Sequence, residues 1–172
     1  DELNLVDGSA SGPLSHRNMI INGAMNVYQR GGTTSFAHDG TATGYSLDQF
    51  KFTFDNPDEW DGTVQQHTMT SAELNTTGFV KAYKLTTGTA ESAIASNEAA
   101  YISQIIEAQN LQHLRYGTAS AKTITLSFWA KSSVTGTYAI GLYKADSTAR
   151  VINKTYTVSD TNWNQYTVTF PG

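Results

Sequence analysis

A two-residue alternation of apolar and polar side chains in the last third of the chain constrains the fold more than any other feature. One face of an extended strand over residues 124–130 is apolar and consists of Ile124, Leu126, Phe128 and Ala130. Residues 136–147 alternate in the same way, and two further runs rich in Thr, Tyr and Val follow. Because successive side chains of a strand point to opposite faces, the pattern predicts an all-β, antiparallel sandwich. No alternation of strands with helices suggests a parallel sheet.

The first two thirds of the chain show shorter runs of the same kind. Phe50, Phe52 and Phe54 share one face of a strand predicted over residues 48–54, and residues 79–85 alternate similarly. In the opening stretch, Met19 and Ile21 are predicted to lie in a strand that ends at Asn22-Gly23, a turn or bulge signal. Residues 100–107 fit both a helix and a strand; we favour a strand followed by one helical turn over residues 110–114.

Domain organisation follows from a change in composition near residue 17. Residues 1–16 are rich in Gly, Ser and Pro and are predicted to form an extended N-terminal arm or linker. Residues 17–172 are predicted to form one sandwich domain. The sequence given ends directly after a strand, and an edge strand without a neighbour would leave open hydrogen-bonding groups. We therefore expect the natural domain to continue beyond Gly172.

The charge balance limits the partners of this chain. Only 15% of the residues are charged, against roughly 25% in typical soluble domains, and the net charge is -4. Without a basic stripe, nucleic-acid binding is not expected. No apolar run is long enough to span a bilayer, so no membrane insertion is expected. The chain has no cysteine, which excludes disulfides and thiolate metal ligands.

No motif in the sequence indicates an enzyme. The chain lacks the nucleophile elbow, the P-loop and the dinucleotide-binding glycine pattern. A glycosidase needs two facing carboxylates, and Asp48 and Glu107 are the only acids inside predicted strands. We interpret each as a partly buried carboxylate that ties a strand to a loop, and we expect no catalysis.

Metal binding is not expected either. The four histidines are not spaced to share one metal ion: His16, His38, His67 and His113. The acids Asp55, Asp58 and Asp61, with Glu59 between them, lie around Pro57 and Trp60 and could supply oxygen ligands to calcium. They lack the spacing of a calcium loop, and turns are commonly acidic. We therefore expect no cofactor, with structural calcium as the alternative at these residues.

Aromatic side chains are the best candidates for ligand binding, because C–H bonds of sugars can stack on their negative faces. Trp60 lies in the acidic loop and is predicted to be the most exposed of the three tryptophans. Trp129 lies opposite Leu126 and Phe128 on its strand, and Tyr143 lies in the next strand. Trp163 is predicted to fill the core beside the last strand. Trp60, Trp129 and Tyr143 are therefore the predicted ligand-binding residues.

Four short elements carry a resemblance to a known family. The first is RNMIINGAMNVYQRG, residues 17–31; the second is YSLDQF, residues 45–50; the third is IEAQN, residues 106–110, with Leu114 downstream; and the fourth is AKTITLSFWAKS, residues 121–132. In this order they resemble a family of tail-fibre and virion appendage domains of marine bacteriophages, in which Trp is more frequent at the position of Phe50. The first and fourth elements also resemble carbohydrate-binding modules.

The resemblance implies a jelly-roll β-sandwich and a structural role in a phage particle. The implied protein is a tail fibre, spike or knob, located in the virion as a tail or capsid appendage, that contacts the host surface by binding a glycan. The implied partners are other virion proteins and a host cell-surface glycan, and such appendages are usually homotrimers. Three alternatives stay open: a carbohydrate-binding module of a polysaccharide-degrading enzyme, a depolymerase, and an architectural capsid or tail decoration protein that binds no sugar.

Overall fold

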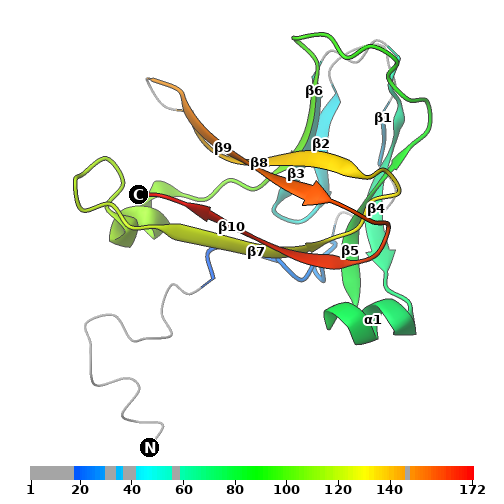
Figure 1. The fold of residues 1–172 in the computed structure, drawn as a ribbon, viewed down its shortest axis with the longest axis horizontal. Coiled ribbons are helices and arrows are strands. Elements are labelled where there is room, and N and C mark those ends of the chain that lie inside the picture. The colour runs from blue at the N-terminus through cyan, green and yellow to red at the C-terminus, as the bar shows by residue number, and fades with distance from the viewer. Residues whose placement is uncertain (1–17, 30–33, 37–41, 56–58, 146–147) are drawn as a thin grey trace, which may run out of the picture. The chain divides into compact units, whose positions relative to one another are not determined.

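A computed structural model describes residues 18–29, 34–36, 42–55, 59–145 and 148–172 (Figure 1). The backbone falls into two compact units. The first consists of the described parts of Asp1–Ser71 and Phe79–Asn110, and the second consists of Ala72–Gly78 and the described parts of Leu111–Gly172. The single sandwich domain expected over residues 17–172 therefore stays a prediction, and the expected arm, residues 1–16, lies outside the described residues.

The first unit contains two three-stranded antiparallel sheets. One has the order β1-β4-β5, formed by β1 (Thr34–Phe36), β4 (Gly62–Thr68) and β5 (Lys81–Thr87). The other has the order β2-β3-β6, formed by β2 (Ala42–Leu47), β3 (Phe50–Asp55) and β6 (Ala99–Ser103).

Side chains from both sheets form one core in the first unit. Phe52 and Phe54 of β3 and Val64 of β4 are buried together, and Trp60 and Tyr83 pack against them. The rings of Phe54 and Trp60 meet edge to face with centroids 4.9 Å apart, a favoured geometry for aromatic pairs. This packing is what the alternation of phenylalanines in residues 50–54 predicts.

The β2–β3 hairpin contains two irregularities. The register shifts between Tyr45 and Leu47, so that Ser46 bulges and its hydroxyl donates a hydrogen bond of 2.8 Å to the hydroxyl of Tyr83. Burial raises the pKa of Tyr83, and the hydrogen bond from Ser46 opposes that rise. The turn residue Gln49 has φ 73°, a left-handed backbone that usually falls to Gly or Asn.

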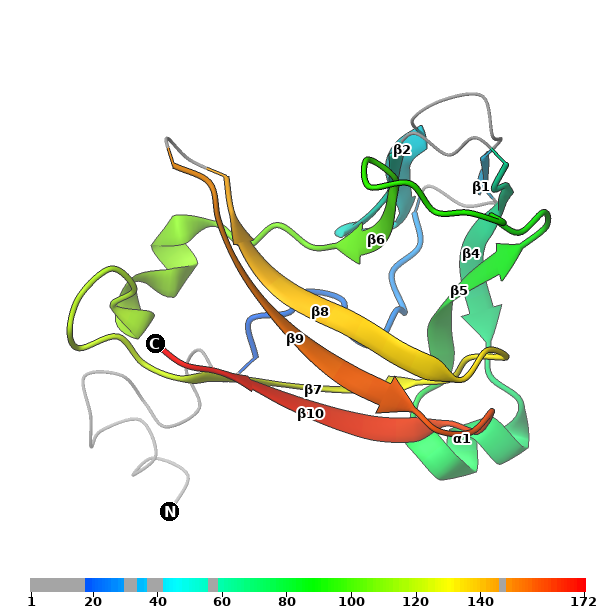
Figure 2. The same ribbon diagram turned by 45° about the horizontal axis from the view of Figure 1, so that its top comes forward.

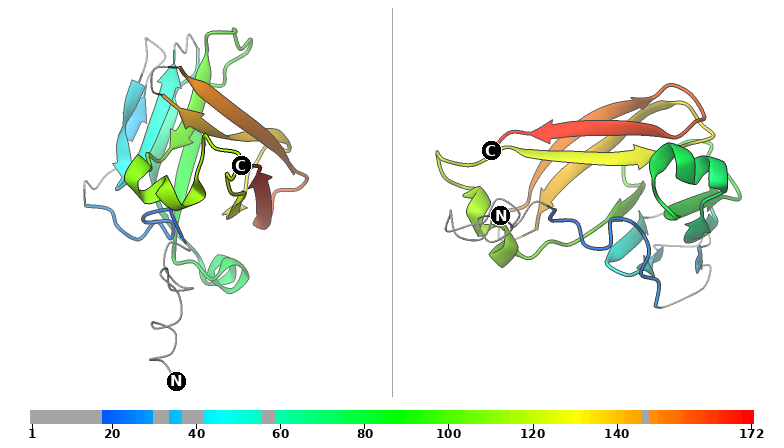
Figure 3. Two further views of the ribbon diagram at one scale, coloured as in Figure 1. Left: turned by 90° about the vertical axis from the view of Figure 1, so that its left-hand side faces the viewer. Right: turned by 90° about the horizontal axis from the view of Figure 1, so that it is seen from below.

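The second unit contains two long antiparallel ribbons (Figure 2). β7 (Ile124–Ala130) pairs along its whole length with β10 (Asn164–Phe170), and the right-hand view of Figure 3 shows these two strands side by side. β8 (Gly136–Lys144) pairs in the same way with β9 (Arg150–Val158).

Four aromatic rings join the two ribbons of the second unit. Phe128 of β7, Tyr166 of β10 and Tyr156 of β9 contact one another, with centroids 4.9 to 5.8 Å apart. Tyr138 of β8 stacks on Tyr156 at 5.7 Å. Phe128 lies on the apolar face predicted for residues 124–130, and Val168 and Phe170 of β10 are buried. The alternation in the last third of the chain therefore reflects real packing.

The described residues also form two short helices. The α-helix α1 (Ser71–Thr77) ends at Gly78, which has φ 77° and donates its N–H to the carbonyl of Leu74. The helical turn predicted over residues 110–114 is a 3-10 helix, η2 (Ala108–Leu114). The prediction missed α1, although Thr70-Ser71-Ala72-Glu73 has the spacing of a capping box and Gly78 follows.

The predicted all-β class is confirmed, since the two helices are short and strands make up most of the regular structure. The strand predicted through Met19 and Ile21 is wrong, because residues 18–20 are irregular and residues 21–24 form a turn. The strand predicted over residues 100–107 is shorter, and β6 ends at Ser103. In both places, side-chain amides hydrogen-bond to the backbone: Asn22 to Val27 and Asp48, and Gln104 to Ile21.

Candidate functional site

The stretch of residues 18–29 is held by side chains rather than by a sheet. Asn22 has φ 57°, and its carbonyl accepts the N–H of Met25 at 2.8 Å, which closes the turn. The side-chain amide of Asn22 donates to the carbonyls of Val27 and Asp48 at 2.9 and 3.0 Å and accepts the N–H of Val27 at 2.9 Å. The left-handed residue in the Asn-Gly pair is thus Asn22, which tolerates this conformation better than other non-glycine residues.

Three more side chains fix the same stretch. Gln104 pairs with both backbone groups of Ile21, at 2.7 and 2.8 Å. Gln66 of β4 donates to the carbonyl of Met25 at 2.6 Å, and the Asp48 carboxylate accepts the N–H of Gln29 at 2.6 Å. Most of these contacts satisfy backbone groups that a strand would otherwise pair. The opening motif therefore folds a loop, and the side-chain amide of Asn22 holds that loop in place.

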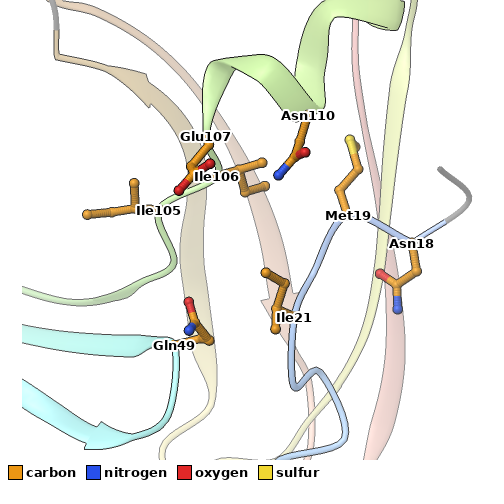
Figure 4. A pocket seen from close by; sticks show the side chains of 8 residues that line it. All are labelled: Asn18, Met19, Ile21, Gln49, Ile105, Ile106, Glu107 and Asn110. Carbon is orange, nitrogen blue, oxygen red and sulfur yellow. The ribbon is translucent and has the colours of Figure 1, made fainter.

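A pocket of about 400 Å³ lies beside this loop in the first unit. Half of its lining is apolar and half is polar, and the residues are Asn18, Met19, Ile21, Gln49, Ile105, Ile106, Glu107 and Asn110 (Figure 4). Its volume is within the range of about 300–1,000 Å³ that small-molecule sites occupy. The first, second and third sequence elements of the resemblance each contribute to this lining, although they lie far apart in the chain.

The pocket has unused hydrogen-bonding capacity. Among the described residues, neither the side chain of Gln49 nor that of Asn110 has a hydrogen-bond partner, and both are exposed. One oxygen of Glu107 accepts a hydrogen bond from the side chain of Gln109, and no described residue is hydrogen-bonded to its other oxygen. Figure 4 shows Gln49 approaching the pocket from the β2–β3 turn and Glu107 and Asn110 from the start of η2. The polar half of the lining can therefore both donate to and accept from a ligand.

The two acids considered for catalysis do not lie in strands. Asp48 is in the β2–β3 turn, half-buried and engaged with Gln29, as the interpretation of a tying carboxylate requires. Glu107 is exposed in the loop that follows β6, so the expectation of a partly buried strand residue is wrong for it.

The acidic loop is engaged with its own surroundings. The carboxylate of Asp61 accepts the N–H and the hydroxyl of Thr89 at 2.7 and 3.0 Å. Asp55 is half-buried at the end of β3, and Asp58 lies outside the described residues. Within the described ranges, no three His, Cys, Asp or Glu side chains gather closely enough to hold a metal ion. His16 and His38 also fall outside those ranges.

The predicted ligand-binding aromatics differ in exposure. Trp60 is half-buried, and its ring packs edge to face on Phe54; the other two tryptophans are also half-buried, so the expectation that Trp60 is the most exposed of the three stays a prediction. Trp129 is half-buried on the face of β7 opposite Phe128, as predicted from the alternation. Tyr143 is 69% exposed and is the freest ring of the three.

Trp163 lies before β10 rather than deep in the core. It is half-buried, and its indole N–H donates to Oε1 of Glu73 at 3.0 Å. The same oxygen lies 3.2 Å from the ammonium of Lys131. This cluster anchors α1 within the second unit.

Sequence reasoning from residue types did not identify the pocket residues, because Met, Ile, Asn and Gln carry no motif of their own. The available signal was the set of motif elements, because the first three of the four contribute residues to this pocket. No protein-family model, no curated protein and no solved structure matches the chain. None of the helices in the described part of the chain has the length and apolar character needed to cross a membrane.

Proposed function

We propose that the chain is a structural protein of a bacteriophage particle, a tail fibre, spike or knob, whose β-domain contacts the host surface by binding a glycan. The four sequence elements support the family, and the two-sheet packing of the first unit is compatible with the jelly-roll sandwich that belongs to this proposal. Assembly as a homotrimer within the virion, with other virion proteins as partners, is part of the same proposal and is testable by light scattering of the full-length protein.

The observation that carries glycan binding is the exposed face of the β8–β9 ribbon around Tyr143. The ring of Tyr143 is 69% exposed, and its cross-strand partner Val151 is 58% exposed. Beside them on the same face, Gly141 pairs with Asn153, and a Cβ on Gly141 would lie 2.2 Å from Oδ1 of Asn153.

This geometry suits a sugar ring. Because Gly141 has no side chain, the side-chain oxygen of Asn153 can lie over the position that a Cβ would occupy, next to Tyr143 on the same face. An aromatic face can stack on the C–H bonds of a sugar, and an amide beside it can donate to and accept from hydroxyl groups. Exposed threonines at positions 155 and 157 extend the polar part of the face.

The test is binding of the full-length protein to a glycan array and to whole host cells, with Tyr143→Ala as the variant. By analogy with base stacking, loss of the ring should cost about 1–3 kcal/mol of binding free energy. Tyr101→Ala is the matched control, because Tyr101 is also exposed, at 49%, but lies on β6 in the first unit. Trp129→Ala and Trp60→Ala test the other two candidates.

The outcomes separate the alternatives. Binding that weakens in Tyr143→Ala and not in Tyr101→Ala supports a receptor-binding face on β8–β9. Binding that is equal in both would overturn this site. A folded wild-type protein that binds no glycan and no cell would favour an architectural capsid or tail protein, and release of reducing sugar from host polysaccharide would favour a depolymerase. A catalytic domain encoded beside this one would favour a carbohydrate-binding module.

A further inference from the structure

We propose that the pocket beside the opening loop is a second ligand site, specific for an acetamido group such as that of an N-acetylated sugar. This inference concerns the first unit and does not depend on the face around Tyr143. It rests on the distribution of apolar and polar side chains in the pocket and on which of those side chains are already engaged.

The apolar half of the pocket fits a methyl group rather than an extended chain. Met19, Ile21, Ile105 and Ile106 supply it, and Ile21 and Ile105 keep 55% and 69% of their surface exposed. Covering these exposed isoleucine side chains with a ligand removes apolar surface from water, which favours binding. With a total volume of about 400 Å³, half of it polar-lined, the pocket suits a single sugar unit.

The polar half of the pocket fits a neutral ligand that both donates and accepts hydrogen bonds. An acetamido group presents one N–H and one C=O. The carboxamides of Gln49 and Asn110, which have no partner among the described residues, offer both kinds of group. The open oxygen of Glu107 can accept the ligand N–H or a hydroxyl.

The pocket is also pre-organised on the side of the loop. Ile21 is held by the two hydrogen bonds from Gln104, and the N–H of Ile20 donates to the side-chain oxygen of Asn18 at 3.0 Å. Gln49 lies in the turn of the β2–β3 hairpin, with φ 73°. A preformed wall lowers the ordering cost of binding.

A cation is the main competing ligand, and the charge of the pocket argues against it. Among the described residues that line the pocket, Glu107 is the one ionisable group. A lone exposed carboxylate attracts an ammonium group weakly in water. Two carboxamides beside it favour a neutral ligand that satisfies donors and acceptors together.

The experiment is an NMR titration of the full chain with three probes of the same ring size: N-acetylglucosamine, glucose and glucosamine. We expect N-acetylglucosamine to shift the side-chain amide signals of Gln49 and Asn110, with a Kd of about 1 mM, as is usual for one sugar unit. Glucose lacks the acetamido group and should bind about tenfold more weakly. Glucosamine keeps the nitrogen but carries a positive charge, and its affinity should be no higher than that of glucose.

Two variants locate the site without endangering the fold. Ile105→Ala removes an exposed wall of the pocket and should weaken N-acetylglucosamine binding about three- to tenfold. Ile94→Ala is the matched control, because Ile94 is 76% exposed and does not line the pocket. Asn110→Ala should weaken binding similarly by removing a donor and an acceptor.

Equal binding of N-acetylglucosamine and glucose, tighter binding of glucosamine, or no shift at Gln49 and Asn110 would each overturn the proposal. The variant Tyr143→Ala distinguishes a failure of the pocket proposal from a failure of the proposed glycan-binding face on β8–β9. If that variant loses cell binding but keeps the titration of Gln49 and Asn110, the pocket is an independent site. If cell binding persists and the titration fails, the pocket proposal fails alone.

Discussion

The side-chain amide of Gln104 forms two hydrogen bonds with the backbone of Ile21, a residue 83 positions earlier in the chain. Nε2 of Gln104 donates to the carbonyl of Ile21 at 2.7 Å, and Oε1 accepts the N–H of Ile21 at 2.8 Å. One side chain thus takes the place of a neighbouring strand. The opening stretch can therefore lie against the first unit and line a pocket without belonging to a sheet.

Replacement of Gln104 should destabilise the first unit. Gln104→Ala removes both hydrogen bonds, and we expect the free energy of unfolding to fall by about 1–2 kcal/mol. Urea denaturation followed by the fluorescence of Trp60, in a protein whose other two tryptophans are replaced by Phe, measures the change. Gln112→Ala is the control, since Gln112 is exposed and its side chain has no hydrogen bond among the described residues. If Gln112→Ala lowers the free energy of unfolding as much as Gln104→Ala does, the amide of Gln104 does not stabilise the first unit in the way we infer.

Asn22→Asp should be more damaging than its size suggests. The change replaces the NH₂ group that donates to the carbonyls of Val27 and Asp48 with an oxygen that repels both. We expect a loss of about 2–3 kcal/mol, because two acceptors lose their donor and a charge is added near the Asp48 carboxylate. Chemical denaturation measures it, and Asn26→Asp, at an exposed position of the same loop, tests whether the added charge alone is responsible.

Two tyrosines of the second unit should respond in opposite directions when their hydroxyls are removed. The hydroxyl of Tyr166 is buried and has no partner among the described residues, so Tyr166→Phe should stabilise by about 1 kcal/mol. The hydroxyl of Tyr138 is bonded to Ser132 and donates to the carbonyl of Val134, both at 2.8 Å. Tyr138→Phe should therefore destabilise by about 1 kcal/mol. Thermal unfolding of both variants checks the pair, and a shift of the same sign in both would refute the assignment.

The stability of the second unit should fall in alkaline solution. Burial raises the pKa of Tyr156, and its neighbours Tyr138 and Tyr166 raise it further. The folded state therefore holds this proton more tightly than the unfolded chain does. The stability that the protonated hydroxyl of Tyr156 contributes to the folded state is fully present below the unfolded pKa near 10.0. It is lost as the pH rises through the folded pKa.

Denaturation midpoints at increasing pH, together with the ultraviolet absorbance of tyrosinate, measure this effect. We expect a constant midpoint up to about pH 9 and a decline above about pH 10. Tyr156→Phe should make the decline shallower. Some decline should persist in that variant because burial also raises the pKa of Tyr116, in the same unit. An unchanged slope would show that Tyr156 does not contribute.

The strands of the last third were predictable because their alternation is a local property. Ile124, Leu126 and Phe128 must share one face of any extended strand, whatever packs against it. The structure places Phe128 among Tyr138, Tyr156 and Tyr166, as that face requires. The same reasoning failed at Met19 and Ile21, where three adjacent apolar residues carried no information about Gln104, 83 positions away.

Neighbouring residues and composition were enough to predict the all-β class, the face of each long strand, the helical turn near residue 110 and the polar, weakly charged surface. The fold was needed to show that Asn22 and Gln104 hold a loop, that Trp60 packs on Phe54 while Tyr143 stays exposed, and that Gln49, Glu107 and Asn110 reach one pocket. These relationships join residues far apart in the chain, and local periodicity cannot specify which distant side chain will satisfy a given backbone group.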